Sequence, residues 1–146
     1  MKTTKVIAVF VLSVLVAYLL GSATSSLIIA SNVAALGVEV SFIDRLGWIG
    51  HDLAGMAAVY LPILVVGFAI AFAVTALILK ASPGLRTIGY VLAGGVALFA
   101  IHQLLYLVTD IHGLPATRST LGLGLQVIAG IAGGYVFARV GAPQTS

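Results

Sequence analysis

Four long apolar stretches dominate the pattern of hydrophobic and polar residues along this chain. They cover about residues 5–30, 52–80, 86–109 and 119–139. Each is as long as the roughly 20 residues that a helix needs to cross the hydrocarbon of a bilayer. We therefore expect an all-α integral membrane protein, a bundle of four transmembrane helices that forms a single domain over residues 1–146.

The connection over residues 31–50 has a pattern of its own. Its apolar residues recur at helical spacing: Phe42, Ile43, Leu46 and Ile49. Asp44 and Arg45 fall on the other side, and Trp48 suits the headgroup level of a membrane. The pattern predicts a short helix lying on the outer surface between the first and second transmembrane helices, with a plain loop as the alternative.

The second transmembrane helix has clear start and stop signals. Asp52 is a suitable N-cap, and the turn-forming run Ser82-Pro83-Gly84 follows Lys80. Pro62 removes a backbone hydrogen bond within this stretch, so we expect a kink in its outer third.

Charged residues are sorted between the two ends of the expected bundle. All four acids fall in the first and third connections or beside them: Glu39, Asp44, Asp52 and Asp110. Most of the bases fall at the opposite ends of the stretches: Lys2, Lys5, Lys80, Arg86 and Arg139. By the positive-inside rule, both chain termini should lie inside, in a multi-pass protein of a bacterial-type inner membrane.

Composition supports the membrane interpretation and excludes several classes of site. Hydrophobic residues make up 61% of the chain and charged residues 8%, whereas soluble domains carry about 25% charged residues. The seven bases are scattered, so no nucleic-acid partner is expected. The chain has no cysteine, which excludes disulfides and thiolate ligands.

The start of the chain resembles a signal peptide. Lys2 and Lys5 precede the apolar run 6–20, and the small residues Gly21-Ser22-Ala23 follow it. Apolar sequence resumes at residues 27–29, so we expect a retained first transmembrane helix.

Small residues form a regular stripe in the fourth apolar stretch. They recur every fourth position with one amide among them: Gly122, Gln126, Gly130, Gly134 and Ala138. Such stripes let two membrane helices approach closely. Gly89, Ala93 and Ala97 in the third stretch offer a matching surface. The contact could close within the bundle or between subunits, and short connections favour the bundle.

The residues with chemical potential gather at the expected outer side. The candidate ligand-binding set is His102, Gln103, Tyr106, His51, Asp52 and Asp110, and the candidate metal ligands are His51, His102 and His112. Imidazoles with carboxylates can bind zinc or copper, His with Tyr or Asp can exchange protons with a quinone, and haem would need a second histidine at the depth of His102.

His102 stands out because an ionisable side chain within a span is costly and is a functional hypothesis by default. The simpler interpretation is a neutral imidazole hydrogen-bonded to Ser25, Gln126 or a backbone carbonyl.

Catalytic templates such as a nucleophile elbow, a Walker loop or a dinucleotide fingerprint are not present in the sequence. We therefore expect a non-enzymatic accessory or assembly subunit, or a homo-oligomer, whose partners are the lipid bilayer and other membrane subunits or itself. The alternative is an outer-leaflet ligand or redox module that binds a quinone, haem or a metal near His102.

Overall fold

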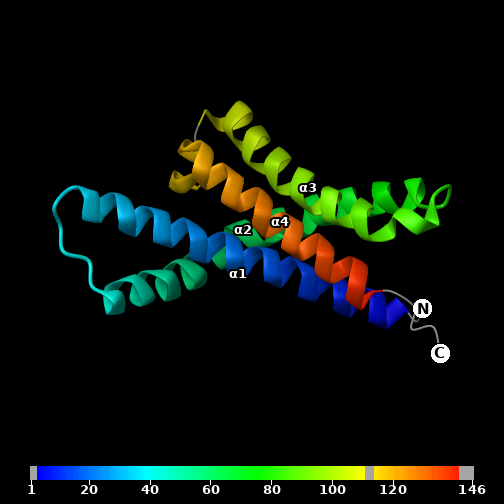
Figure 1. Cartoon of the computed structure of the whole chain (residues 1–146), viewed down its shortest axis with the longest axis horizontal. Helices are drawn as coiled ribbons and strands as arrows, with labels where there is room; N and C mark the ends of the chain where they lie inside the picture. Colours follow the sequence, from blue (N-terminus) through cyan, green and yellow to red (C-terminus); the bar gives the residue numbers. More distant parts are fainter. Residues whose placement is uncertain (1–2, 111–113, 142–146) are drawn as a thin grey trace.

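The computed structural model describes residues 3–110 and 114–141. Its long helices are α1 (Thr3–Ala35), α2 (Phe42–Ile78), α3 (Arg86–Thr109) and α4 (Thr120–Val140), and two short 3-10 helices, η1 (Pro83–Leu85) and η2 (Pro115–Arg118), precede α3 and α4 (Figure 1). In these described ranges, four helical segments are long and apolar enough to cross a membrane, and no strand is present. The prediction of an all-helical chain with four membrane-spanning segments is confirmed.

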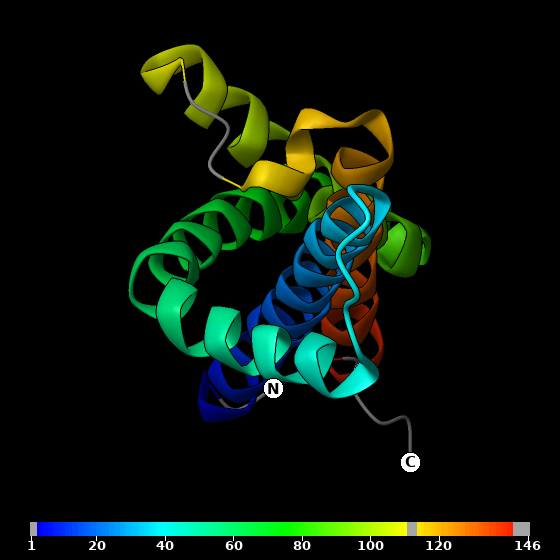
Figure 2. The same ribbon diagram turned by 90° about the vertical axis from the view of Figure 1, so that its left-hand side faces the viewer.

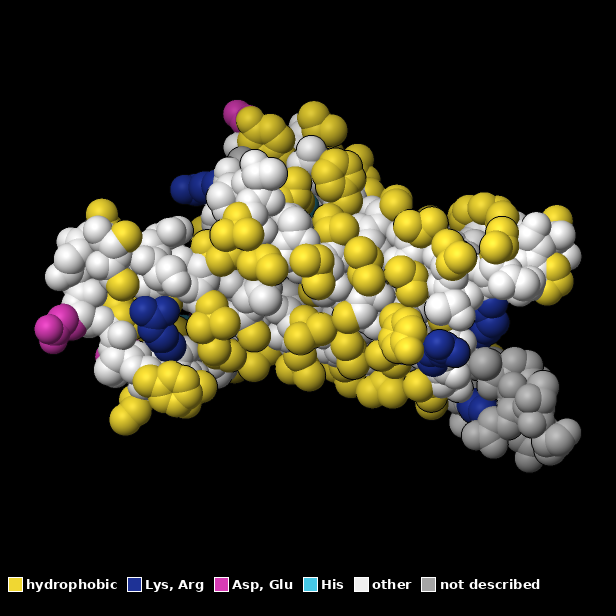
Figure 3. All heavy atoms as spheres, in the orientation of Figure 1, with side chains coloured by type: hydrophobic (Ala, Val, Ile, Leu, Met, Phe, Trp, Pro, Cys, Tyr) yellow, Lys and Arg dark blue, Asp and Glu magenta, His cyan; other side chains and the backbone are white. Residues whose placement is uncertain are grey.

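The two ends of the bundle differ in charge. The start of α1 and the end of α4 lie at one end, where Figure 3 shows basic side chains without acidic ones, while the acidic side chains appear toward the opposite end together with further basic ones. We call the first the terminal end, marked by Lys5, Lys80, Arg86 and Arg139, and the other the acidic end. The charge sorting read from the sequence is therefore also a sorting in space.

Helix α4 is the centre of the packing. It lies against both α3 and α1, while α2 packs on α1 and makes a sparser contact with α3. Toward the terminal end, aromatic rings from all four helices stack edge to face or tilted around Phe72. Its ring centroid lies 4.6 Å from that of Phe137, 5.3 Å from that of Tyr90 and 6.2 Å from that of Phe10.

Glycines bring α3 and α4 into backbone contact. A Cβ added to Gly130 would lie 2.2 Å from the carbonyl oxygen of Gly94, and one added to Gly134 would lie 2.0 Å from that of Tyr90. Both distances are far below van der Waals contact, so only glycine fits. This part of the small-residue stripe packs within one chain. Gly122 lies instead against the Ala116 carbonyl of η2. The matching surface predicted on the third stretch is wrong, because Gly89, Ala93 and Ala97 line the side of α3 that faces α2.

Helix α2 begins ten residues earlier than the sequence suggested. The Ser41 hydroxyl accepts a hydrogen bond from the Asp44 amide (3.1 Å), and Asp44 Oδ2 accepts one from the Ser41 amide (3.0 Å), which is a complete capping box. The predicted start near Asp52 is therefore wrong, because Asp52 lies inside a continuous helix. Residues 42–51 are the first turns of α2, and no separate surface helix precedes it in the described chain.

Helices α1 and α2 are longer than a bilayer requires. At about 1.5 Å per residue, their 33 and 37 residues span roughly 50 and 55 Å, against about 30 Å of hydrocarbon. Figure 2 shows how α2 uses this length: its first turns run sideways across the acidic end before the helix turns along the bundle. Pro62, the position where the sequence predicts a kink, lies inside this continuous helix.

Candidate functional site

His102 lies in a buried polar network that joins all four helices. Its side chain is 2% exposed, and its Nε2 lies 3.1 Å from the hydroxyl oxygen of Tyr60 on α2. The Tyr60 hydroxyl donates to Oε1 of Gln126 on α4 (3.3 Å), and Gln126 Nε2 donates to the carbonyl oxygen of Gly21 on α1 (2.8 Å). We call Gly21, Tyr60, His102 and Gln126 the four-helix network.

The donors and acceptors of this network fix the orientation of the Gln126 amide. The Gly21 carbonyl can only accept, so the Gln126 amide must turn its NH₂ toward α1 and its oxygen toward Tyr60. That oxygen accepts the single hydroxyl proton of Tyr60. When the Tyr60 hydroxyl donates to Gln126, its oxygen is left as an acceptor for a proton on His102 Nε2. The backbone carbonyl on α1 thereby orients the Gln126 amide that faces Tyr60.

The network depends on the absence of a side chain at Gly21. A Cβ there would lie 2.6 Å from Gln126 Oε1, closer than a Cβ and an oxygen can approach. Gln126 is fully buried, so its amide has no room to move to solvent. Gly21 therefore supplies both the acceptor and the space for Gln126.

A second set of polar contacts ties α1 to α2 nearer the acidic end. The Ser26 hydroxyl donates to Oδ2 of Asp52 at 2.5 Å and also lies 3.1 Å from the Ser22 carbonyl oxygen. The Tyr18 hydroxyl donates to the carbonyl oxygen of Leu53. Asp52, expected to cap a helix, instead uses its half-buried carboxylate to join two helices.

The other candidate residues are dispersed. Gln103, Tyr106 and Asp110 have exposed side chains on or just after α3, and His51 is exposed on α2. His112 lies outside the described residues. Within the part of the chain that the structure describes, no three His, Asp or Glu side chains lie close enough together to hold a metal ion.

Tyr60 is the member of the network that sequence reasoning overlooked. A usable signal was present, because the buried residues of α2 recur every fourth position: Tyr60, Leu64, Phe68 and Phe72. A polar-tipped residue at the start of such a stripe needs a buried partner for its hydroxyl. The sequence had named Gln126 as a partner for His102, whereas in the structure Tyr60 stands between them.

The network has limited chemistry of its own. An imidazole can take up a proton and a phenol can pass one, but the amide and the backbone carbonyl cannot titrate. Each of the three bonds between the four members joins one helix to another, so the arrangement sets the register of the bundle.

No protein-family model matches the chain, and no curated protein or solved structure is detectably similar to it.

Proposed function

We propose that this chain is a non-enzymatic accessory or assembly subunit of a membrane complex. It binds its partner subunit through the first part of α2, residues 42–59, which we call the α2 arm. None of these residues is buried, whereas the remainder of α2 contributes five residues to the buried core. The arm is thus a helix whose surface the described chain leaves largely uncovered.

The supporting observation is an apolar stripe that continues past the packing of the bundle. Along α2 the stripe includes Leu53, Met56 and Ala57, which are partly buried against the core. At the same helical spacing it continues outward to Phe42 and Leu46, whose side chains are 73% and 52% exposed. An exposed apolar stripe of this kind marks a surface for a protein or a membrane interface.

The arm is built as a stable helix. Its capping box satisfies two of the backbone groups that a helix start leaves open. Helical segments in proteins nonetheless draw most of their stability from packing an apolar face. A capped helix with an uncovered apolar stripe suits a segment whose packing partner is another chain. Arg45 lies at the edge of the stripe and suits the polar rim of such a contact, while Asp44 lies on the opposite face of the helix.

Co-purification of the full chain from its native membranes tests the proposal. The wild type should be recovered with a second chain at fixed stoichiometry, and the double variant Phe42→Ser/Leu46→Ser should lose that chain. Leu107→Ser/Val108→Ser is the matched control, because these α3 side chains are 76% and 81% exposed at the same end of the bundle. Circular dichroism should show that both variants keep their helix content.

Two results would contradict the accessory role. One is a wild-type chain that is monomeric and alone in every mild detergent and in lipid nanodiscs. The other is a partner that the arm variant retains as well as the wild type does. If the partner has the same mass as the chain, the complex is a homo-oligomer, and the arm is then its interface.

A second candidate function is a ligand or redox module at His102. The observation in its favour is the burial of an imidazole and a phenol with their polar atoms 3.1 Å apart inside a membrane-spanning bundle. Purified protein should then show a haem band in its absorption spectrum, a bound metal by elemental analysis, or a quinone on solvent extraction. His102→Ala should remove that ligand. A colourless, metal-free and quinone-free sample eliminates this function.

A further inference from the structure

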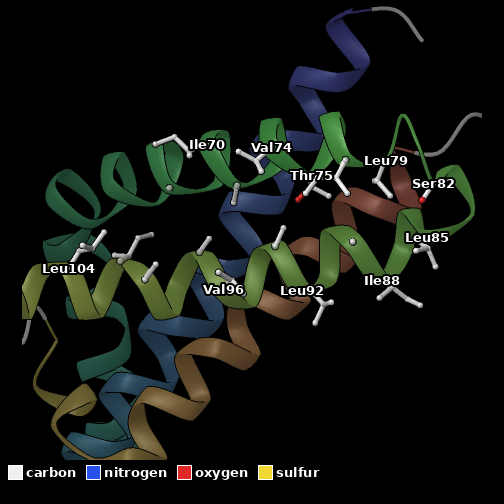
Figure 4. Close-up of a pocket in the computed structure, with 18 residues that line it drawn as sticks. Ile70, Val74, Thr75, Leu79, Ser82, Leu85, Ile88, Leu92, Val96 and Leu104 are labelled. Atoms are coloured by element: carbon white, nitrogen blue, oxygen red, sulfur yellow. The ribbon is translucent and has the colours of Figure 1, made fainter.

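A long apolar groove runs between α2 and α3, from Leu104 to the terminal end (Figure 4). Its floor includes small residues that are buried or half-buried: Gly67, Ala71, Ala93 and Ala97. Its walls include large apolar side chains that are more than half exposed: Ile70, Val74, Leu92 and Val96. The groove exists because α2 and α3 face each other with small residues yet touch sparsely.

The groove is long and continuous. Along α3 it extends from Leu85 to Leu104, which at about 1.5 Å per residue is roughly 28 Å. Its volume is about 630 Å³, and its lining is almost wholly apolar. The groove is therefore long enough and apolar enough to hold an extended acyl chain of a membrane lipid.

The turn at the terminal end of the groove carries a hydroxyl group and an exposed basic residue. Ser82 lines the groove there, and Thr75 adds a hydroxyl along its floor. Lys80 is exposed two residues before Ser82, and Arg86 follows the lining residue Leu85. The Arg86 guanidinium is directed toward α4, since its Nε donates to the Ala138 carbonyl oxygen (3.3 Å) and it lies over the Tyr90 ring. Lys80 is therefore the base available to a head group at the end of the groove.

No negative charge offsets these bases nearby. All four acidic residues of the chain belong to the acidic end: Glu39, Asp44, Asp52 and Asp110. An anion at the mouth of the groove would therefore meet positive charge alone. Basic pockets between transmembrane helices favour anionic lipid head groups, and each nearby Lys or Arg strengthens the attraction.

We propose that this groove binds an anionic glycerophospholipid, with one acyl chain lying between α2 and α3 and the phosphate beside Lys80. The positive-inside rule predicts that the terminal end faces the cytoplasmic leaflet, where anionic lipids are abundant. This site is distinct from the α2 arm and does not depend on the accessory role of the chain.

Native mass spectrometry of the full chain, in micelles with equal phosphatidylglycerol and phosphatidylcholine of identical acyl chains, tests the head-group part of the proposal. The wild type should retain phosphatidylglycerol about fivefold more than phosphatidylcholine, and Lys80→Gln should remove most of that preference, because one Lys supplies about that factor. Arg139→Gln is the matched control, since Arg139 lies over Tyr135 on α4, a helix that contributes no residue to the groove, whereas Lys80 lies between the lining residues Leu79 and Ser82. It should leave the preference unchanged.

A second pair of variants tests the acyl-chain part. Ala93→Leu places a large side chain on the floor of the groove and should abolish retention of both lipids. Ala76→Leu puts the same side chain on an exposed position of α2 that does not line the groove, and should have no effect.

Equal retention of the two lipids by the wild type would overturn the proposal. So would an unchanged preference in Lys80→Gln, full retention by Ala93→Leu, or a lipid-free mass of two chains that Ala93→Leu converts to one. The last result would assign the groove to a second copy of the chain.

Discussion

Removing one hydroxyl from the four-helix network should measurably weaken the bundle. Tyr60→Phe deletes the oxygen that lies 3.1 Å from His102 Nε2 and 3.3 Å from Gln126 Oε1, and it changes nothing else about the ring. Both partners then lose a bond at sites that are 2% and 0% exposed. Buried polar groups left unsatisfied cost about 1–3 kcal/mol, whereas interhelical hydrogen bonds in membranes average about 0.6 kcal/mol.

We therefore expect Tyr60→Phe to lower the free energy of unfolding by about 1–3 kcal/mol, or roughly 5- to 150-fold in the unfolding equilibrium constant. Unfolding of the purified chain by increasing SDS in mixed micelles, followed by circular dichroism, measures this quantity. Tyr135→Phe is the matched control, because Tyr135 is 48% exposed on the surface of α4. It should change the free energy by less than about 0.5 kcal/mol.

A double-mutant cycle separates the network from general packing. Gln126→Leu removes the acceptor of the Tyr60 hydroxyl while nearly preserving volume. The double variant Tyr60→Phe/Gln126→Leu should lower the free energy of unfolding by less than the sum of the single changes. Each single change leaves one buried polar group without its partner, and the other change removes that group. Additive effects, or a Tyr60→Phe variant as stable as Tyr135→Phe, would refute the inference that these bonds hold the four helices together.

Three further changes have outcomes that follow from local geometry. Gly130→Ala forces a Cβ against a backbone oxygen 2.2 Å away and should cost about 1–3 kcal/mol in SDS unfolding, whereas Gly124→Ala, with nothing within 4 Å, should be neutral or stabilising. Ser41→Ala breaks the capping box and should cost about 0.5–2 kcal/mol, with faster amide hydrogen exchange confined to the first turn of α2. Ser26→Ala removes the 2.5 Å bond to Asp52 and should speed exchange in the α2 arm while leaving α3 and α4 unchanged.

The four spans could be predicted from sequence because hydrophobic length is a local property of the chain. Local sequence also explains why the predicted start of α2 is wrong. Asp52 stands at the edge of the most apolar region and makes a plausible cap, so it outweighed the Ser41 and Asp44 pair ten residues earlier. Hydropathy locates the part of a helix that suits lipid, and it does not locate the end of the helix.

The candidate site shows what the sequence could not supply. The sequence shows that His102 is an isolated ionisable residue within a span, and it suggests Gln126 as one partner. The link through Tyr60 depends on the axial position of α2 relative to α3 and α4. That register follows from side-chain packing across three helices and has no local signature. The sequence shows the charge of Asp52 but does not identify its partner. Ser26 is one of four hydroxyl residues between positions 22 and 26, and the sequence does not distinguish among them.

The most direct test of the accessory role is site-specific photo-crosslinking in native membranes. A photoreactive phenylalanine analogue at position 42, on the α2 arm, should form one discrete adduct with a second chain, and the same probe at position 107, on the exposed surface of α3, should form none. Adducts with lipid alone from position 42, or the same protein adduct from both positions, would contradict the proposal that the arm is the docking surface.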